Sequence, residues 1–238
     1  MRIWDTGKAT ARENMAQDAF LLQNLERDSD AVLHLYDWWG DSATYGHFIK
    51  PETFFDLDTV AEKGISLAKR PTGGGIIFHS FDFTFSLAIP TQHRLYSPNT
   101  LDSYANVNRE VIEVICQFLG KKCDAMLLGS QPKGQKGPSQ HFCMASPTKY
   151  DVILDGKKVG GAAQRRTRFG LLHQGSISLV RPCREFIRTV LKEGESIYVK
   201  MVDQGNALMT STENYADGRR HFCDQMKQHF LTSGDSSL

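Results

Sequence analysis

The sequence lacks the features that define several large classes of protein. Its 238 residues contain no apolar stretch long enough to cross a membrane, and residues 1–5 lack the apolar core of a signal peptide. The formal net charge is only +1, so no overall field would draw the chain to nucleic acid or to a membrane surface. The motif GxxxxGK(S/T) is also absent, which argues against a P-loop nucleotide hydrolase.

Cysteine is scarce and irregularly placed. The number of cysteines is odd, and no two of them form a Cys-x-x-Cys pair. This usage predicts free thiols in a cytoplasmic protein, without a disulfide framework or structural zinc. His79, His141 and His173 lie far apart in the sequence, so we expect no metal site. The cysteines are Cys116, Cys123, Cys143, Cys183 and Cys223.

Apolar periodicity predicts an α+β fold without internal repeats. Apolar residues recur at helical spacing over about 11–26, 57–67, 100–119 and 222–230, which predicts four helices. Phe20 is expected on the apolar side of the first helix. Strands are expected at 31–36, at 125–128 and, most clearly, at 80–89. In that last segment Phe81, Phe83 and every second residue to Ile89 are apolar, which predicts a half-buried strand. A Ser-Gly-Asp tail at the C-terminus is expected to be flexible.

A glycine run lies between an arginine and an apolar segment, in the motif RPTGGGIIFH at residues 70–79. Consecutive glycines cost backbone entropy and add no packing, so they indicate a sharp turn or a close approach to a ligand. Arg70 offers a fixed cation with several donors. A glycine turn beside a solvated arginine and a cradle for an anionic or carbonyl-bearing ligand both fit this pattern.

A second motif, DGKKVGGAAQ at residues 155–164, predicts a β-hairpin. The Asp-Gly pair favours a two-residue turn, which pairs Leu154 with Lys157 and Ile153 with Lys158. Lys157 fits an exposed edge position. We expect Lys158 to share a face with residues 160, 162 and 164, which are small except for the last, and across the ladder with Ile153 and Asp151. The space beside such a lysine could hold a ligand.

Cys143 is the candidate nucleophile. It follows a polar Gly/Pro/Lys loop at 129–138, which fits either a flap over a site or a linker. A lone cysteine is often a small buried hydrophobe. Cys143 differs because it lies between His141 and a nearby lysine, and a cation or an imidazole would favour its thiolate.

Taken together, these motifs resemble the catalytic domain of the lipoate–protein ligase A and octanoyltransferase family. The similarity covers roughly residues 1–200 and adds NMAQD at 14–18 and HQGSI at 173–177. It implies a mixed, largely antiparallel β-sheet flanked by helices, as in biotin ligases. It also implies an acyl-binding catalytic domain at 1–205, followed by a C-terminal helix and tail at 206–238 with no large accessory domain.

The resemblance also implies the roles of the site residues. Cys143 and Lys158 would be catalytic, with Lys158 contacting the acyl carbonyl. Ala162 stands where many members carry serine, and the order His173-Gln174 is unusual. Tyr36, Trp38 and Phe78 could line a channel for an eight-carbon chain or pack in the core. The substrate-binding residues would be Arg70, Thr72, Gly73, Gly74, Gly75, Phe78, His79, Gly160, Gly161, Ala162, Ala163 and His173.

Two chemistries occur in this family. The transferases move an octanoyl or lipoyl group from a carrier thioester to a cysteine and then to a lysine of a lipoyl domain, without a cofactor. Their cysteine lies about seven residues before a Tyr-Asp type pair, as Cys143 does before Tyr150-Asp151, and Gln164-Arg165-Arg166 also favours them. The ligases instead activate lipoate with ATP and Mg²⁺. A non-catalytic lipoyl- or biotin-binding module is a further alternative.

The resemblance also suggests partners. Acceptors would be lipoyl-domain proteins, namely the acyltransferase subunits of dehydrogenase complexes and the glycine cleavage H protein, and acyl carrier protein could be the donor. Neither nucleic acid nor membrane is expected. The basic run at 165–168 fits a solvated face, or a contact with an acidic lipoyl domain or a phosphopantetheine arm.

Overall fold

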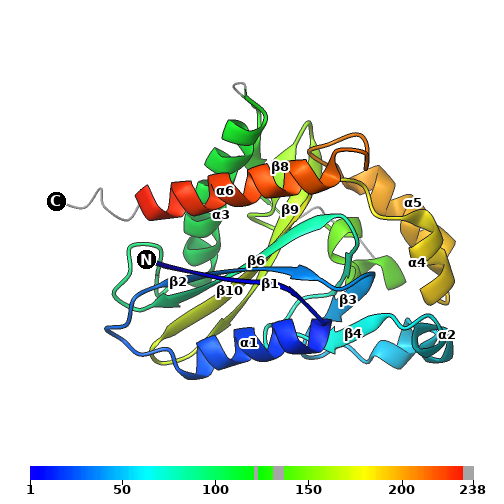
Figure 1. The fold of residues 1–238 in the computed structure, drawn as a ribbon, viewed down its shortest axis with the longest axis horizontal. Coiled ribbons are helices and arrows are strands. Elements are labelled where there is room, and N and C mark those ends of the chain that lie inside the picture. Colours follow the sequence, from blue (N-terminus) through cyan, green and yellow to red (C-terminus); the bar gives the residue numbers. More distant parts are fainter. Residues whose placement is uncertain (121–122, 131–136, 233–238) are drawn as a thin grey trace.

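A computed structural model describes residues 1–120, 123–130 and 137–232, and its centre is a seven-stranded sheet (Figure 1). β1 and β2 are parallel, and every other neighbouring pair is antiparallel. The predicted mixed, largely antiparallel sheet is therefore confirmed. The strands, in spatial order, are β1 (Arg2–Ala9), β2 (Val32–Trp38), β6 (Asp82–Pro90), β10 (Gly170–Ser178), β9 (Lys157–Arg166), β8 (Val152–Leu154) and β7 (Met126–Leu127).

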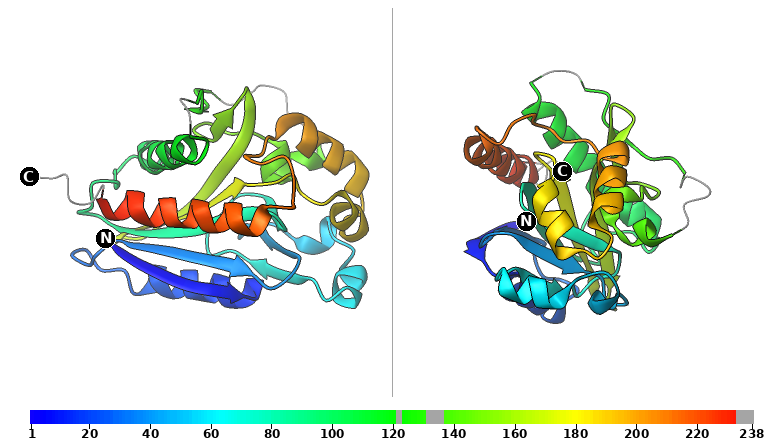
Figure 2. Two further views of the ribbon diagram at one scale, coloured as in Figure 1. Left: turned by 45° about the horizontal axis from the view of Figure 1, so that its top comes forward. Right: turned by 90° about the vertical axis from the view of Figure 1, so that its right-hand side faces the viewer.

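Helices cover both faces of this sheet. In the left view of Figure 2, α3 (Thr100–Phe118) and α6 (Tyr215–Thr232) lie above it and α1 (Ala11–Gln23) lies below. The main core lies beneath α3 and α6, where Phe83 of β6 packs against Phe222, and Val111 belongs to the same cluster. The predicted helices at 100–119 and 222–230 are thus confirmed. Phe20 was wrongly expected on the apolar side of α1: it is 58% exposed, because Ala11, Met15 and Leu22 form the buried side.

A smaller sheet stands beside the large one. Its order is β4 (Ser66–Lys69), β3 (Ser42–Tyr45) and β5 (Ile76–His79), with β3 parallel to β4 and antiparallel to β5. The helix predicted at 57–67 is only partly correct. α2 (Leu57–Glu62) ends early because Gly64 adopts a φ of 63°, after which the chain extends into β4. The other elements of the described residues are α4 (Arg184–Val190), α5 (Gly194–Gln204) and three short 3-10 helices at Pro51–Thr53, Pro138–His141 and Cys143–Ala145.

The prediction for β6 was half right. Its apolar face, from Phe83 to Ile89, lies in the main core as expected. The other face is not exposed, however, since every residue of β6 is buried. That second face carries Asp82, Thr84 and Ser86, which have partners inside the protein: Thr84 donates to Asp82 Oδ2, His79 of β5 lies against the same oxygen, and Ser86 donates to Asp18 of α1. A strand with alternating polarity can therefore be buried on both sides when its polar face lines a site.

The expectation of free thiols throughout was wrong. Cys116, in the last turn of α3, forms a disulfide with Cys123, whereas Cys143, Cys183 and Cys223 are free. The chain reverses after α3 to enter β7, which brings the Cα atoms of the two cysteines within 5.4 Å. Most of the predicted loop at 129–138 and the tail after residue 232 lie outside the described residues.

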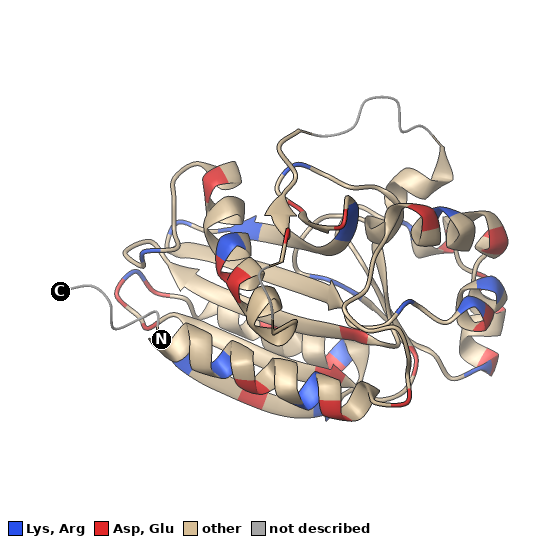
Figure 3. Cartoon of the chain, turned by 90° about the horizontal axis from the view of Figure 1, so that it is seen from above, with Lys and Arg blue, Asp and Glu red and all other residues tan. Residues whose placement is uncertain are grey.

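Charge is distributed without a dominant sign. In Figure 3, Lys and Arg alternate with Asp and Glu along the helices of this face. No helix among the described residues is both long and apolar enough to span a membrane.

Candidate active site

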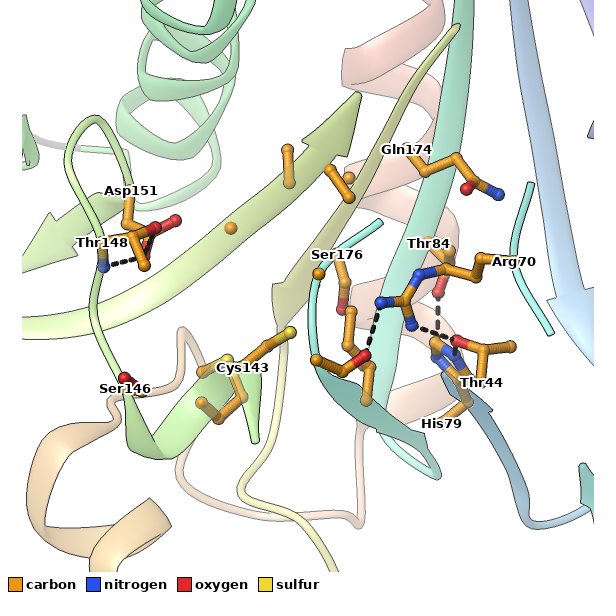
Figure 4. A pocket seen from close by; sticks show the side chains of 18 of the residues that line it. Thr44, Arg70, His79, Thr84, Cys143, Ser146, Thr148, Asp151, Gln174 and Ser176 are labelled. Atoms are coloured by element: carbon orange, nitrogen blue, oxygen red, sulfur yellow. Dashed lines mark hydrogen bonds between the residues drawn. The ribbon is translucent and has the colours of Figure 1, made fainter. Parts of the chain in front are cut away.

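A cavity of about 270 Å³ opens between the two sheets. Its floor is the polar face of β6, β9 and β10, and its walls come from α1, β5 and the turn at Cys143–Ala145. In Figure 4, Cys143 lies between a polar group around Asp151 and another around Arg70. The cavity therefore brings the glycine motif, the hairpin motif and the candidate nucleophile together.

The hairpin has the predicted turn and register. Asp155 and Gly156 both have positive φ, and Ile153 and Leu154 pair with Lys158 and Lys157. A β-bulge follows at once, because Val152 pairs with Gly160 and leaves one extra residue on β9. This bulge shifts the alternation of side chains by one position beyond Lys158.

Because of the bulge, Lys158 does not have the neighbours on β9 that alternation predicted. The Lys158 side chain lies over Gly161, where a Cβ would come within 2.8 Å of Nζ. Gly161 and Ala163 pair with Ser176 and Gln174, so these residues form the cavity floor. Ala162 pairs with Gly175, where a Cβ would meet the Phe85 ring of the core, although Ala162 also borders the cavity. The pair Gln164–His173 lies against Tyr104 of α3.

Lys158 is buried, and its Nζ contacts two oxygen atoms. Its Nζ lies 2.7 Å from Asp151 Oδ2 and donates to the Cys143 carbonyl oxygen, also at 2.7 Å. Asp151 Oδ2 in turn accepts from the backbone and side chain of Thr148, at 2.6 and 3.0 Å. One ammonium therefore links the hairpin to the turn that carries Cys143.

The glycine run brings backbone segments close together. A Cβ on Gly75 would lie 2.2 Å from the His141 carbonyl oxygen, and one on Gly46 would lie 2.0 Å from the Gly74 oxygen. Gly74 has a φ of 85°, which favours glycine. Ile76 forms a bridge with Phe142, so β5 runs directly beside the Cys143 segment. The close approach indicated by the sequence is thus to the protein's own backbone.

Arg70 is buried, so the alternative prediction of a solvated arginine beside a glycine turn is wrong. It is 3% exposed and donates to the carbonyl oxygens of Gly73 and Gly75 and to Thr44 Oγ1, at 3.1, 2.6 and 2.9 Å. Burial lowers the pKa of Arg70, while the nearby Cys143 side chain raises it. The cation close to Cys143 is therefore an arginine, whereas the predicted lysine binds the cysteine's carbonyl oxygen.

A chain of buried polar groups continues from Arg70. Thr44 Oγ1 lies 2.8 Å from His79 Nε2, and His79 Nδ1 lies 2.8 Å from Asp82 Oδ2. Burial would raise the pKa of Asp82, but the charge and hydrogen bond of His79, together with donors from Ser176 and Thr84, lower it overall. His79 also stacks on Trp38 with ring centroids 3.9 Å apart. These contacts hold Thr44 in place, and Thr44 in turn accepts a hydrogen bond from the Arg70 guanidinium.

The structure divides the predicted site residues into two groups. Residues 160 and 173 lie against the core: Gly160 packs on Ile177, and His173 stacks on Phe85, where burial lowers its pKa to about 3. Phe78 packs against the rings of Phe142 and Phe186, Thr72 donates to Gln174, and Gly73 offers only its carbonyl oxygen to Arg70. Those that line the cavity are Arg70, Gly74, Gly75, His79, Cys143, Lys158, Gly161, Ala162 and Ala163, joined by Tyr36 and Trp38.

The sequence assigned no role to three polar residues of the site. The hairpin register placed Asp151 on the Lys158 face, and the ion pair between the two side chains confirms that they are neighbours, although the sequence assigned Asp151 no role. Thr44 gave no signal in the sequence. Gln174, next to the predicted His173, is the residue that faces the cavity, where it donates to Asp18 Oδ2 at 2.5 Å.

No metal-binding arrangement accompanies these groups. Across residues 1–120, 123–130 and 137–232, no cluster of three or more His, Cys, Asp or Glu side chains could hold a metal ion.

The fold is that of lipoate-ligase catalytic domains. This chain is similar to a solved structure titled "Crystal structure of lipoate-protein ligase A bound with ATP", with a TM-score of 0.69 and 20% sequence identity. The match covers 99% of this chain and 94% of the chain in that structure. The family described as "Lipoyl protein ligase A/B catalytic domain" matches residues 10–233. The chain belongs to this family, as its motifs suggested.

Curated relatives carry a transferase name. "Octanoyltransferase LipM" of Staphylococcus epidermidis is 28% identical over 180 residues, which cover 74% of this chain and 65% of the relative. The protein of the same name from Staphylococcus aureus is 28% identical over 200 residues, covering 83% and 72%. The chain thus spans about two thirds of the length of these relatives.

Proposed function

We propose that this protein transfers an octanoyl or lipoyl group from a carrier thioester to a lysine of a lipoyl domain, through an acyl-thioester on Cys143. One observation carries the proposal: the Cys143 turn borders the cavity between two fixed cations, Arg70 near its side chain and Lys158 on its carbonyl oxygen. A cation beside a thiol favours the thiolate, which is the reactive form.

In the first step, the Cys143 thiolate attacks the carbonyl carbon of the donor thioester. A new C–S bond forms, negative charge develops on the carbonyl oxygen, and the donor's C–S bond then breaks. Lys158 Nζ lines the cavity and can donate to that oxygen. The departing carrier thiolate takes a proton from water.

In the second step, the neutral amine of the acceptor lysine attacks the same carbonyl carbon. The Cys143 thiolate leaves, Arg70 again stabilises its charge, and the nitrogen loses a proton to solvent as the amide forms. The thioester bond supplies the driving force, so this route needs no nucleotide. ATP and Mg²⁺ belong to the ligase alternative.

The acyl chain would lie along the apolar side of the cavity. Met15, Tyr36, Trp38 and Ile77 line it there and offer contacts without charge.

A basic groove lies outside the Arg70 wall of the cavity. Arg12, Lys69 and Arg165 line it, no carboxylate does, and Arg70 and Met15 border both spaces. Arg12, Lys69 and Arg165 form no ion pairs within the described part of the chain. We assign this groove to the acidic carrier or its phosphopantetheine phosphate. The acceptors would be lipoyl domains of dehydrogenase complexes or the H protein.

Intact mass spectrometry tests the proposal. Incubation with octanoyl carrier-protein thioester should add one octanoyl group, which hydroxylamine removes. Cys143→Ser should abolish this labile adduct, whereas Cys183→Ser, which alters another free cysteine outside the cavity, should retain it. AMP formation from lipoate and ATP that persists in Cys143→Ser would instead support the ligase, and binding without transfer would support a non-catalytic module.

A further inference from the structure

The ammonium of Lys158 has two acceptors fixed by the protein. Lys158 is 3% exposed, and Nζ lies 2.7 Å from both Asp151 Oδ2 and the Cys143 carbonyl oxygen. A lysine ammonium carries three hydrogens. Two of them are therefore committed, and the third is the one available to a ligand in the cavity.

Asp151 is itself held in place. It is 3% exposed, and Oδ2 also accepts the two hydrogen bonds from Thr148. A Cβ on Gly161 would come within 2.9 Å of Asp151 Oδ1 and 2.8 Å of Lys158 Nζ. The ion pair thus lies directly on the β9 backbone, in a space that only glycine leaves open.

The lining of the cavity offers Lys158 one counter-charge among the described residues. Asp151 is the single carboxylate among the described residues that line it. Burying an ammonium without a counter-charge favours its neutral form. The titratable or charged groups that face Lys158 across the cavity are Tyr36 from β2, Arg70 after β4, His79 from β5, His141, Cys143 and Asp151.

We infer that Asp151 is a positioning residue that keeps Lys158 protonated and aimed, so that Lys158 donates a hydrogen bond to the acyl carbonyl oxygen and does not accept the Cys143 proton. This inference rests on the proposed function. The thiol proton leaves to solvent before attack, and Arg70 stabilises the resulting thiolate. Lys158 keeps its three hydrogens throughout both steps.

The substitution Asp151→Asn tests the inference, because it keeps the shape and removes the charge. The observable is the rate of octanoyl addition to Cys143, followed by quenched intact mass from about pH 6 to about pH 9. The parent rate should rise with pH to a plateau as the thiolate forms. In the variant the maximal rate should fall by about 10²-fold, and the rate should decline at high pH as Lys158 loses its proton.

Asp155→Asn is the matched control. Asp155 lies at the exposed tip of the same hairpin, and its substitution should leave the rate and the pH profile unchanged. Asp151→Glu restores the charge, so it should recover a plateau at high pH even where its rate is reduced. This variant decides the question if Asp151→Asn does not fold.

A merely structural role predicts a different outcome. Asp151→Asn would then lower the rate by the same factor at every pH. It would also lower the rate by the same factor in the parent and in the Lys158→Met variant. If Asp151 acts through Lys158, the second loss should be small once Lys158 is gone. An unchanged profile or equal losses would overturn the inference while the Cys143 adduct, and with it the proposed function, still stood. Adduct formation in Cys143→Ser would overturn the proposed function itself.

Discussion

A single methyl group at Gly75 should disturb the segment that carries Cys143. In Gly75→Ala the new Cβ would lie 2.2 Å from the His141 carbonyl oxygen and 2.7 Å from its carbon, so backbone must move. The Cys143 sulfur, 3.4 Å from the same Cβ, belongs to the segment that would be displaced. Overpacking of this kind costs about 1–3 kcal/mol. A displacement of about 1 Å at a nucleophile lowers a rate by about 10²-fold.

Two measurements check this prediction. Gly75→Ala should lower the melting temperature by roughly 4–8 °C, which corresponds to about 2 kcal/mol in a chain of this size. It should also slow the single-turnover formation of the Cys143 adduct by about 10²-fold. The matched control is Gly73→Ala, because a Cβ there meets nothing within 4 Å and the carbonyl oxygen that binds Arg70 is retained. Equal rates and melting temperatures in the two variants would refute the reasoning.

Two further predictions concern charge. The hydrogen bond from His229 lowers the pKa of Glu110 to about 2, so this carboxylate stabilises the fold above about pH 4.5 and the contribution is lost as the pH falls towards 2. Glu110→Gln should therefore flatten the acid limb of stability measured by urea unfolding, and an acid limb like the parent's would contradict it. In the groove, the double variant Lys69→Glu and Arg165→Glu should raise KM for the carrier-bound donor by about 10-fold at low salt, without changing kcat for a small thioester that lacks a phosphate. The exposed Lys63→Glu is its control, and an equal rise in KM there would rule out a specific groove.

Local signals in the sequence predicted much of this site. The Asp155-Gly156 turn set the hairpin register, since both residues tolerate positive φ and the strands on either side have no other tight connection. The glycine run correctly indicated a close approach at residues 73–75. Cys143 was singled out by its neighbours, and the structure places it at the cavity with a cation nearby.

Other features depended on contacts between distant segments. The bulge after Lys158 arises from pairing with β8, and it moved Gly161 and Ala163 onto the cavity face where alternation alone predicted residues 160 and 162. The partner of the glycine run is the His141 backbone, 66 residues away, which no local pattern reveals. The same holds for the Cys116–Cys123 disulfide, because it requires the chain reversal after α3.

The most direct test of the central claim is a chase of the isolated acyl-enzyme. The protein is first loaded from an octanoyl thioester, freed of donor, and then mixed with an apo lipoyl domain while intact masses of both proteins are followed. The account predicts that the octanoyl group leaves Cys143 and appears on the lipoyl-domain lysine, at a rate no slower than overall turnover and without ATP. An adduct that persists while turnover proceeds, or a transfer that requires ATP, would contradict it.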